Sequence, residues 1–474
     1  MIHSKLVVLG GGPGGYAAAF LAADLGIETT IVDLNDTLGG TCLLRGCIPS
    51  KALLHTAKLI HEAREASEWG VTFAEPTVDI DKLRDHKDTI IRNLTTGLGQ
   101  LAKRRKVRVI NACGRFENST TLKLDGGNPE TYSEGDTLTF DHCILATGSI
   151  PAMPGFMNIG SDRVMDSTGA LKLQDVPGKF LVIGGGYIGL EMGTVYNALG
   201  SEVTVVEMTK SLLPGADADM VRPLAARLKK QFANIYLDTK VAALREVDNQ
   251  IEVTFEGKNP GVELFDRVLV SVGRRPNNTG YGLENTNVKI NDKGFVEVDD
   301  QQRTADENIF AIGDIAGDPM LAHKAAYEGK IAVEVLAGKD VKANAKAIPA
   351  VVFTDPELAW AGPTEAELKA AGVKYQAAKY PWLASGRAHA ISRTEGATKI
   401  LVEPETEKVI GAAIVGAGAG ELIAEATLAI EQGITAHQLA QTIHAHPTMS
   451  ETVAFSAESY FGLATEIYKP KRKK

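Results

Sequence analysis

Cysteine is scarce in this chain, which has four in 474 residues. A small secreted scaffold stapled by disulfides would need a denser framework, so that class of protein is excluded. Long apolar runs are also missing, since none approaches the roughly 18 residues that a membrane-spanning helix needs. The first residues do not have the form of a signal peptide, because a brief apolar run leads straight into a glycine-rich turn. We therefore expect a cytoplasmic protein without a membrane partner, or an organellar one from which a leader has been removed.

Positive charge is in short supply as well. The chain has 50 Lys and Arg against 59 Asp and Glu, a formal net charge of −9, which argues against a nucleic-acid partner. Basic residues gather only in the run 103–108 and in the tail 469–474, and we expect both to be solvated ends. At about 100–200 residues per domain, the length predicts three domains.

The few cysteines include one informative pair. Cys42 and Cys47 lie in the stretch GGTCLLRGCIPSK, residues 39–51, whose spacing is not the C-x-x-C of thioredoxin-like or zinc-ribbon proteins. Positions five apart on a regular helix point about 140° away from each other, so a bridge needs a distorted backbone, for which Gly46 and Pro49 are suited. A strained disulfide is labile and more often catalytic than structural. Two buried, inert thiols are the alternative.

A glycine-rich turn stands near the start of the chain. Gly10, Gly12 and Gly15 fit the spacing G-x-G-x-x-G between a strand-like run and a helix-like run over 16–25, and Asp33 closes the next strand-like run. Only glycine permits the tight turn, the approach of backbone to a pyrophosphate and the close helix–strand contact. The helix N-terminus then faces the phosphates, and the acid accepts from a ribose hydroxyl. This predicts a dinucleotide site.

The same pattern occurs a second time. A strand over 179–183 is followed by Gly184, Gly186 and Gly189, by a helix and by a strand that closes at Glu207. The first glycine and the acid are 23 positions apart in both copies. Two dinucleotide sites beside a cysteine pair indicate an electron relay in which one nucleotide is a flavin and the other a nicotinamide. An acid at 207 favours a free ribose 2′-hydroxyl, hence NAD over NADP.

The segment around the cysteines resembles the active-site signature of the pyridine nucleotide–disulfide oxidoreductases, usually GGTC-N-V-GC-[IV]-P-[SK]-K. The likeness covers essentially the whole chain, with further matches at ATG (146–148), SVGRRP (271–276), IGD (312–314), MLAH (320–323) and HAHPTMSE (444–451). It implies an α/β fold with two Rossmann-like dinucleotide-binding domains, for FAD and NAD, and a C-terminal α+β interface domain. Leu44 and Arg45 replace the usual Asn-Val, and we expect Arg45 to point to solvent.

The resemblance also implies a domain order. We predict an FAD-binding domain over 1–150, an NAD-binding domain over 151–275, a central segment over 276–345 that completes the FAD domain, and an interface domain over 346–474. A charged helical pair is expected within 62–108. The interface domain should alternate strands with helices, namely strands at 350–354, 399–403 and 409–415 and helices at 364–371, 421–432 and 436–442.

Individual site residues follow from the same resemblance. The family's FAD-binding positions fall on Gly10, Gly12, Gly15, Asp33, Gly40, Thr41, Lys51, Gly114, Thr147, Gly148, Asp314, Leu321 and Ala322. Its NAD-binding positions fall on Gly184, Gly186, Tyr187, Ile188, Gly189, Glu207, Val241 and Gly273. Its catalytic positions fall on Cys42, Cys47, Lys51, Glu191, His446 and Glu451.

The roles implied for these residues form one mechanism. Lys51, one helical turn beyond Cys47, pairs with Glu191 beside the flavin. His446, oriented by Glu451, is the general base and reaches the cysteines of a second subunit, so a homodimer is implied. The branch of the family that the chain resembles most reoxidises dihydrolipoamide with NAD. Its partners are the lipoyl domains of the core acyltransferase of 2-oxo acid dehydrogenases, and it also serves glycine-cleavage complexes.

Other readings remain at this point. A glutathione-reductase-like enzyme should carry cationic residues where Glu207 stands and Lys in place of Ser50, and a mercuric reductase should end in a cysteine pair. A non-catalytic flavoprotein subunit of a larger complex is a further alternative. It would have no need to keep both cysteines and His446. Tyr187 does not discriminate between these enzymes.

Overall fold

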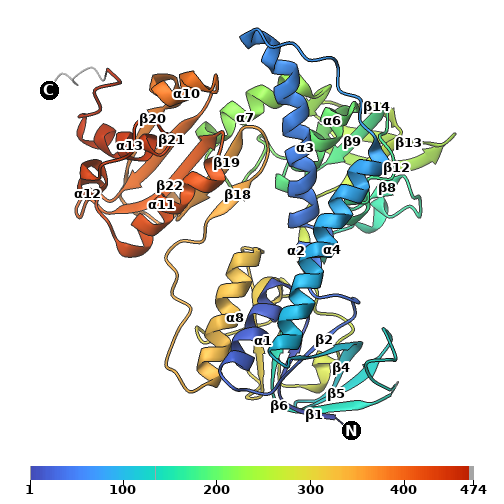
Figure 1. Ribbon diagram of the computed structural model, residues 1–474. Helices are drawn as coiled ribbons and strands as arrows, with labels where there is room; N and C mark the ends of the chain where they lie inside the picture. Colours follow the sequence, from blue (N-terminus) through green and yellow to red (C-terminus); the bar gives the residue numbers. More distant parts are fainter. Residues whose placement is uncertain (1, 134, 469–474) are drawn as a thin grey trace.

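The computed structural model describes residues 2–133 and 135–468. It has three parts, a lower unit that contains the N-terminus, an upper unit from the middle of the chain, and a C-terminal unit beside the latter (Figure 1). In the described residues no helix is both long and apolar enough to cross a membrane. The basic tail 469–474, for which a solvated end was predicted, lies outside the described residues.

The lower unit is built on a seven-stranded sheet in the order β3-β2-β1-β6-β5-β4, with β17 also pairing β6. Strands β1, β2, β3, β6 and β17 are parallel. Successive residues of β1 are buried on opposite faces, because Val7 and Leu9 join one core cluster whereas Leu6 and Val8 join another. Helices α1 and α8 cover the second face. The elements are β1 (Ile2–Leu9), α1 (Pro13–Asp24), β2 (Thr29–Asp33), β3 (Arg108–Asn111), β4 (Cys113–Asn118), β5 (Thr121–Asp125), β6 (Thr137–Leu145), β17 (Ile309–Ala311) and α8 (Ala322–Leu336).

The upper unit repeats this plan in a smaller, five-stranded sheet of order β11-β10-β9-β15-β8. An antiparallel sheet of order β12-β13-β14 lies beside it. Strands β7 and β16, at the start and the end of this part of the chain, pair with each other in a two-stranded sheet. The elements are β7 (Ser149–Pro151), β8 (Val164–Met165), α5 (Ser167–Leu171), β9 (Lys179–Ile183), α6 (Tyr187–Leu199), β10 (Glu202–Val206), α7 (Ala218–Gln231), β11 (Asn234–Tyr236), β12 (Thr239–Val247), β13 (Gln250–Gly257), β14 (Gly261–Phe265), β15 (Arg267–Val270) and β16 (Arg274–Pro276).

The C-terminal unit is an antiparallel sheet, β18-β19-β22-β21-β20, packed against helices. All the predicted strands and helices of this part are present. Sequence reasoning missed β19, a short central strand between Pro356 and Pro363, and β20, an edge strand that ends in a proline. The elements are β18 (Ala350–Val352), β19 (Glu357–Ala361), α9 (Glu365–Ala370), β20 (Gln376–Pro381), α10 (Gly386–Ala390), β21 (Ala397–Val402), β22 (Val409–Gly416), α11 (Ala419–Gln432), α12 (Ala436–Gln441) and α13 (Glu451–Phe461).

The helical pair predicted within 62–108 needs correction. The first helix, α3 (Cys47–Glu65), begins at the second cysteine and only ends in that range, whereas α4 (Ile80–Arg104) fills most of it. The short helix α2 (Gly40–Arg45) precedes α3. Helix α4 runs from the upper unit down to the lower one (Figure 1). The basic run 103–108 is not wholly solvated, because Arg105 hydrogen-bonds Asp24 at 2.9 Å and its guanidinium lies over the Phe20 ring.

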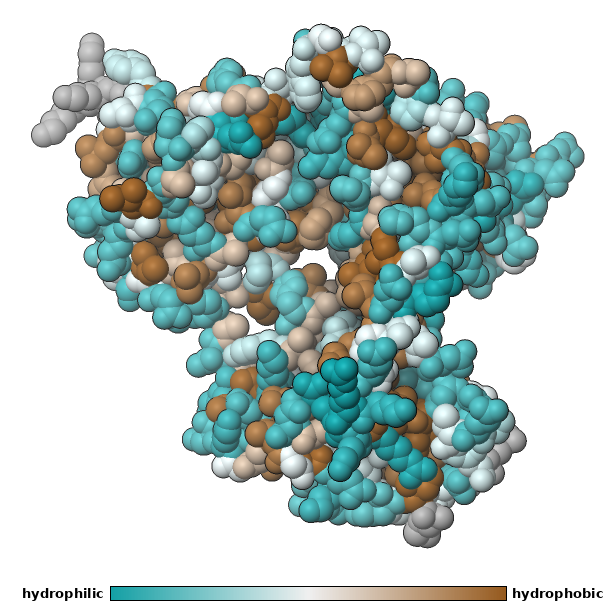
Figure 2. Space-filling model, viewed as in Figure 1, coloured by the Kyte–Doolittle hydropathy of each residue, from teal (hydrophilic) through white to brown (hydrophobic). Residues whose placement is uncertain are grey.

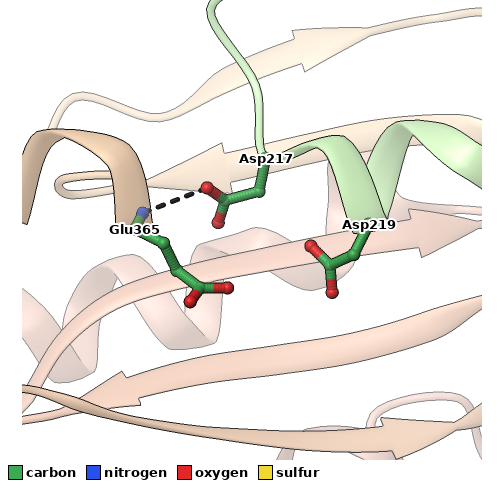
Figure 3. Close-up of side chains that lie close together, drawn as sticks. All are labelled: Asp217, Asp219 and Glu365. Atoms are coloured by element: carbon green, nitrogen blue, oxygen red, sulfur yellow. Dashed lines mark hydrogen bonds between the residues drawn. The ribbon is translucent and has the colours of Figure 1, made fainter. Parts of the chain in front are cut away.

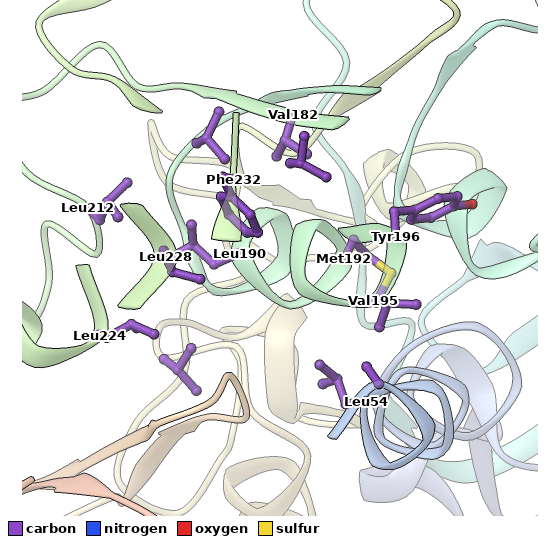
Figure 4. Packing of buried hydrophobic residues seen from close by; sticks show 14 of the residues in the cluster. Leu54, Val182, Leu190, Met192, Val195, Tyr196, Leu212, Leu224, Leu228 and Phe232 are labelled. Atoms are coloured by element: carbon purple, nitrogen blue, oxygen red, sulfur yellow. The ribbon is translucent and has the colours of Figure 1, made fainter. Parts of the chain in front are cut away.

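Helix α6 is the packing centre of the upper unit. Leu190, Met192 and Val195 are almost fully buried, and Figure 4 shows this helix between the Phe232 and Val182 side chains on one side and Leu54 of α3 on the other. Because interiors are close-packed, this contact fixes α3 against α6. It thereby brings a helix that begins at Cys47 against a helix of the second nucleotide unit.

A cluster of charges joins the upper and C-terminal units. Asp217, Asp219 and Glu365 converge in Figure 3, and Lys399 of β21 places its ammonium 2.7, 2.7 and 2.8 Å from them. Burial opposes the charge on Lys399, but hydrogen bonds to these carboxylates outweigh it and raise its pKa. The three acids are thus matched by a buried cation.

Candidate active site

The cysteine pair sits where one helix ends and another begins. Gly46 separates α2 from α3 with φ −148° and ψ −110°, outside the helical and strand regions. A Cβ there would lie 2.9 Å from the Thr41 carbonyl oxygen, so glycine is required. Pro49 lies in the first turn of α3, where proline is tolerated. The distortion that brings the cysteines together therefore resides at Gly46, and the part predicted for Pro49 is wrong.

The two sulfurs interact directly as free thiols. A hydrogen bond from the Cys42 thiol, helped by the Lys51 ammonium, lowers the pKa of Cys47 to about 7, although burial opposes this. The same hydrogen bond, together with burial, raises the pKa of Cys42 far above the ordinary thiol range. In this reduced arrangement Cys47 is therefore the sulfur poised to be a thiolate near neutral pH.

An ion pair lies next to Cys47. Lys51, on the next turn of α3, places its Nζ 2.9 Å from Oε2 of Glu191, which α6 contributes from the upper unit. The Glu191 side chain is only 3% exposed. The backbone N–H of Phe353, just after β18, donates to Glu191 Oε1 at 3.0 Å. The pairing that the resemblance implies is thus present, and it carries a third partner that the sequence did not point to.

The first glycine turn is tight enough to exclude any side chain. Gly10 has φ +112°, and a Cβ there would meet the Ala146 carbonyl oxygen at 2.3 Å. A Cβ at Gly15 would meet the Gly10 carbonyl oxygen at 1.9 Å, and one at Gly40 would meet the Gly12 Cα at 2.5 Å. These contacts bring the start of α1 and the start of α2 together. The result is a backbone cradle at a helix N-terminus, the arrangement that binds a pyrophosphate.

The acid of the first turn accepts three hydrogen bonds. Asp33 accepts from the Gly11 N–H at 2.5 Å, from the Asn35 backbone N–H at 2.7 Å and from the Asn35 side-chain amide at 2.6 Å. Arg45, which was expected to point to solvent, donates to Asn35 Oδ1 at 3.0 Å. That expectation is therefore wrong: the residue that departs from the family's usual pattern is tied back to the nucleotide turn.

The second turn repeats this geometry. Gly184 has φ +107°, and a Cβ there would meet the Ser271 carbonyl oxygen at 2.5 Å. Glu207, 8% exposed, accepts from the Gly185 N–H at 2.7 Å and from the Thr209 N–H at 2.8 Å. Both turns thus stand at the carboxyl ends of parallel strands with an acid closing the next strand.

A cleft of about 1110 Å³ joins the first glycine turn to the cysteines and the ion pair. In Figure 2 the view is open through a gap between the lower unit and the units above it. Its lining combines the glycine cradle with the cysteines, which fits a long cofactor whose pyrophosphate lies on the turn and whose reactive ring lies at the sulfurs. The predicted residues that line it are Gly10, Gly12, Asp33, Gly40, Thr41, Cys42, Cys47, Lys51, Gly114, Thr147, Gly148, Tyr187, Ile188, Glu191, Asp314 and Ala322.

Other predicted residues lie outside that lining. Gly15 lies beneath the first turn, and Leu321 is the neighbour of two lining residues. The NAD-type positions Gly184, Gly186, Gly189, Glu207 and Gly273 belong to the second turn and its surroundings. Val241 is 6% exposed and belongs to a hydrophobic core cluster, which leaves only its backbone to face a nucleotide.

The two histidines near the C-terminus differ sharply. His446 Nδ1 lies 2.9 Å from Oε1 of Glu451, and its side chain is 78% exposed. His444 has a side chain only 9% exposed, and its Nε2 lies 2.6 Å from Glu425. The exposed ring nitrogen of His446 is therefore available, as a general base requires. His446 does not line the cleft of its own chain.

Some residues of the site were not predicted. Ser149 Oγ donates to Asp314 Oδ2 at 2.5 Å and accepts from Arg274 Nε at 2.8 Å, a chain of contacts that places Asp314. Arg274 stood in a matched motif without an assigned role. Asn35 and Phe353 lie outside all the matched motifs, so no sequence signal pointed to them.

Comparisons with known proteins agree with this geometry. The family model "Pyridine nucleotide-disulphide oxidoreductase" matches residues 4–329, and the dimerisation-domain model of the same family matches residues 348–457. The chain belongs to the pyridine nucleotide–disulphide oxidoreductase family. FAD and NAD are its cofactors, and it is an NAD-dependent flavin disulfide oxidoreductase.

Individual relatives narrow the likeness further. The chain is 49% identical over 476 residues to a dihydrolipoyl dehydrogenase of Vibrio cholerae, covering 100% of this chain and 99% of that protein. It is 48% identical over 475 residues to one of Haemophilus influenzae, covering 100% and 98%. Among solved structures, LpdA of Mycobacterium tuberculosis matches with a TM-score of 0.87 at 27% identity, covering 96% and 99%. The flavoprotein disulfide reductase RclA of Escherichia coli matches with a TM-score of 0.86 at 26% identity, covering 97% and 99%.

Proposed function

We propose that this protein is a dihydrolipoyl dehydrogenase, which oxidises dihydrolipoamide to lipoamide and reduces NAD⁺ to NADH. The observation that carries the proposal is one cleft that holds the Cys42–Cys47 pair, the Lys51–Glu191 ion pair and a dinucleotide cradle. Whole-chain identity to dihydrolipoyl dehydrogenases supports the same substrate. A non-catalytic flavoprotein would have no use for a thiol whose pKa is lowered to about 7.

The chemistry begins with the oxidised cysteine pair. His446 of the partner subunit takes a proton from one thiol of dihydrolipoamide, and the resulting thiolate attacks Cys42 Sγ. The Cys42–Cys47 bond breaks, and Cys47 leaves as a thiolate stabilised by Lys51. The second substrate thiol then attacks the substrate sulfur of the mixed disulfide and passes its proton to the departing Cys42 sulfur, so that lipoamide leaves and Cys42 becomes a thiol. Two electrons have moved from the substrate to the cysteines, with one proton now on Cys42 and the other on His446 of the partner subunit.

Bound FAD supplies the route by which these two electrons reach NAD⁺. The chain's own contribution to that route is position and charge. The glycine cradle of the first turn, with Asp33, would hold FAD, and the second turn, with Glu207, would hold NAD. Asp314, fixed by Ser149, faces the same cleft and would bind the flavin side of FAD. Lys51 places a positive charge at the sulfur end of the cleft.

Several finer features belong to the same proposal. His446 lies outside the cysteine cleft of its own chain, which supports a homodimer whose sites combine two subunits. The domain boundaries near 150, 275 and 345 stay a prediction. We further propose that the protein works in the cytoplasm, since a chain with only four cysteines in 474 residues suits a reducing compartment. Its partners would be the lipoyl domains of a 2-oxo acid dehydrogenase core acyltransferase.

The test is a matrix of substrates on the FAD-containing dimer. Dihydrolipoamide with NAD⁺ should bleach the flavin and then produce NADH, whereas glutathione disulfide with NADPH should give no comparable turnover. Free lipoamide and a lipoylated domain should both be substrates in the reverse direction. Faster turnover with glutathione disulfide than with lipoamide would overturn the proposal, and a flavin that neither substrate bleaches would favour a non-catalytic subunit.

A further inference from the structure

Three parts of the chain meet at the Lys51 ammonium. Lys51 comes from α3, Glu191 from α6 of the upper unit, and Phe353 from the C-terminal unit. The Lys51 Nζ lies 4.4 Å from the centre of the Phe353 ring, over its face, while it pairs with Glu191 at 2.9 Å. The Phe353 N–H donates to the same glutamate at 3.0 Å. One residue of the C-terminal unit thus contacts both members of the ion pair, its ring the cation and its backbone the anion.

The segment that carries Phe353 is itself anchored. The next two residues, Thr354 and Asp355, are 2% and 8% exposed. Asp355 accepts from Arg393 of the C-terminal unit and, at 2.8 Å, from Arg227 of α7. Arg227 also reaches Glu65, the last residue of α3, at 2.6 Å. The segment thus contacts Lys51 near the start of α3 and is linked through Arg227 to Glu65 at the end of that helix, and these contacts hold Phe353 in place beside Lys51.

We propose that Phe353 is a positioning residue that holds the Lys51 ammonium against Glu191 and beside Cys47, so that the C-terminal unit helps to stabilise the Cys47 thiolate. This inference rests on the proposed function, because it gives Phe353 a part in the same dithiol site. An aromatic face attracts a cation, and the attraction is stronger where water is excluded. Without the ring, the four-carbon stem of Lys51 is free to move its charge toward solvent.

The charged and titratable groups around Cys47 come from four elements. They are Tyr16 of α1, Cys42 of α2, Lys51 of α3, and Tyr187 and Glu191 of α6. Lys51 is the only cation among these groups of the same chain, and it favours the thiolate, whereas Glu191 opposes it. Loss of the Phe353 ring therefore weakens the attraction between the Lys51 ammonium and the Cys47 thiolate. The thiolate becomes less stable, and the pKa of Cys47 rises.

The experiment follows the thiolate directly. The FAD-containing dimer is reduced by two electrons, and the long-wavelength absorbance of the thiolate–flavin complex is titrated against pH for wild type, Phe353→Leu, Phe353→Tyr and Phe461→Leu. The wild-type midpoint is the reference. Phe353→Leu, which keeps bulk and backbone but loses the ring, should titrate about half a pH unit higher. Phe353→Tyr keeps a ring and should titrate with wild type.

Phe461→Leu is the matched control, the same change in a half-buried phenylalanine of the C-terminal unit that contacts Tyr460 and His437. It should leave the midpoint in place. If Phe353→Leu does not retain FAD, Phe353→Met replaces it with an unbranched side chain that also lacks a ring. An unshifted midpoint in the ringless variant, or an equal shift in Phe353→Tyr, would overturn the inference and leave the proposed function standing. A wild-type protein with no thiolate–flavin band would overturn both.

Discussion

The two nucleotide turns make the same local hydrogen bonds, but the segments that follow them lead to different parts of the molecule. In both turns, an acid 23 positions after the first motif glycine accepts a hydrogen bond from the N–H of the residue that follows that glycine. Gly11 donates to Asp33, and Gly185 donates to Glu207. In both turns, the chain beyond the acid comes back and donates a hydrogen bond to the carbonyl oxygen of that same residue. The Gly39 N–H donates to Gly11, and the Leu213 N–H donates to Gly185.

The paths then diverge. After the first return, Gly40 packs on Gly12 and starts the short helix that carries Cys42. After the second return, the chain enters α7 by way of Asp217, which contacts Lys399 of the C-terminal sheet. The first half, meaning the first nucleotide turn and the segment after it, thus leads to the redox-active cysteines. The second half, meaning the second turn and the segment after it, leads to an ion pair between the upper and C-terminal units. The repeated unit supplies nucleotide binding, and the segment that follows it supplies the specific task.

The largest effects should come from the cysteines, which belong to the first half alone. Cys47→Ser should abolish the thiolate–flavin absorbance, and Cys42→Ser should keep it while blocking exchange with substrate. Either should lower lipoamide turnover by about 10³-fold or more. NADH oxidation by an artificial acceptor should persist, because the second half is untouched. Near-wild-type lipoamide turnover in both variants would show that the relay is wrong.

The next largest effect should come from His446, which lies in the C-terminal unit but acts at the cysteines of the first half. His446→Gln should lower lipoamide turnover by about 10²–10⁴-fold, the usual contribution of a general base, and spare artificial acceptors. Glu451→Gln should cost less, because Glu451 orients the ring. His444→Gln is the control, since His444 is held by Glu425 and should change turnover little.

Subunit mixing sharpens the test of His446. A Cys42→Ser protomer combined with a His446→Gln protomer should regain activity, because some heterodimers carry one intact composite site. Steady inactivity after verified exchange of subunits would mean that both groups act within one chain.

A matched glycine pair should separate the two halves. Alanine at Gly10 or Gly184 would place a Cβ 2.3 or 2.5 Å from a carbonyl oxygen, at φ values that alanine rarely adopts. At about 1–3 kcal/mol of strain, the corresponding nucleotide should bind roughly 5- to 150-fold more weakly. Gly10→Ala should lose FAD, measured by reconstitution of the apoprotein. Gly184→Ala should keep FAD and raise KM for NAD. The same phenotype in both variants would contradict the division of labour.

The smallest effect concerns nucleotide choice in the second half. Glu207 should disfavour a 2′-phosphate, so kcat/KM should be much larger for NAD than for NADP. Glu207→Arg should move that ratio toward NADP by about tenfold, a change of roughly 1.4 kcal/mol, without restoring the full rate. Equal use of the two nucleotides by wild type would remove the role assigned to Glu207.

Sequence reasoning succeeded where function depends on neighbours along the chain. The strand at 179–183 is placed as predicted, and the predicted helix follows its glycine turn as α6, because an apolar run and glycines at fixed spacing mark both elements. The C-terminal strand β20 was missed, since an edge strand ending in proline carries a weak pattern. The helical pair was misplaced because its start was predicted from the rise in charged residues at 62. Helix α3 instead begins at Cys47, where the backbone break at Gly46 ends α2.

By itself the sequence determined the two nucleotide turns, their acids, the cysteine pair and the strands that flank the turns. These features rest on backbone conformations and close approaches that only particular residues at fixed spacing allow. Only the tertiary structure decided that Arg45 hydrogen-bonds Asn35 and that the Phe353 ring lies against the Lys51 ammonium. Phe353 follows Lys51 by about 300 positions, and such contacts are set by how packed units meet, which no local pattern encodes.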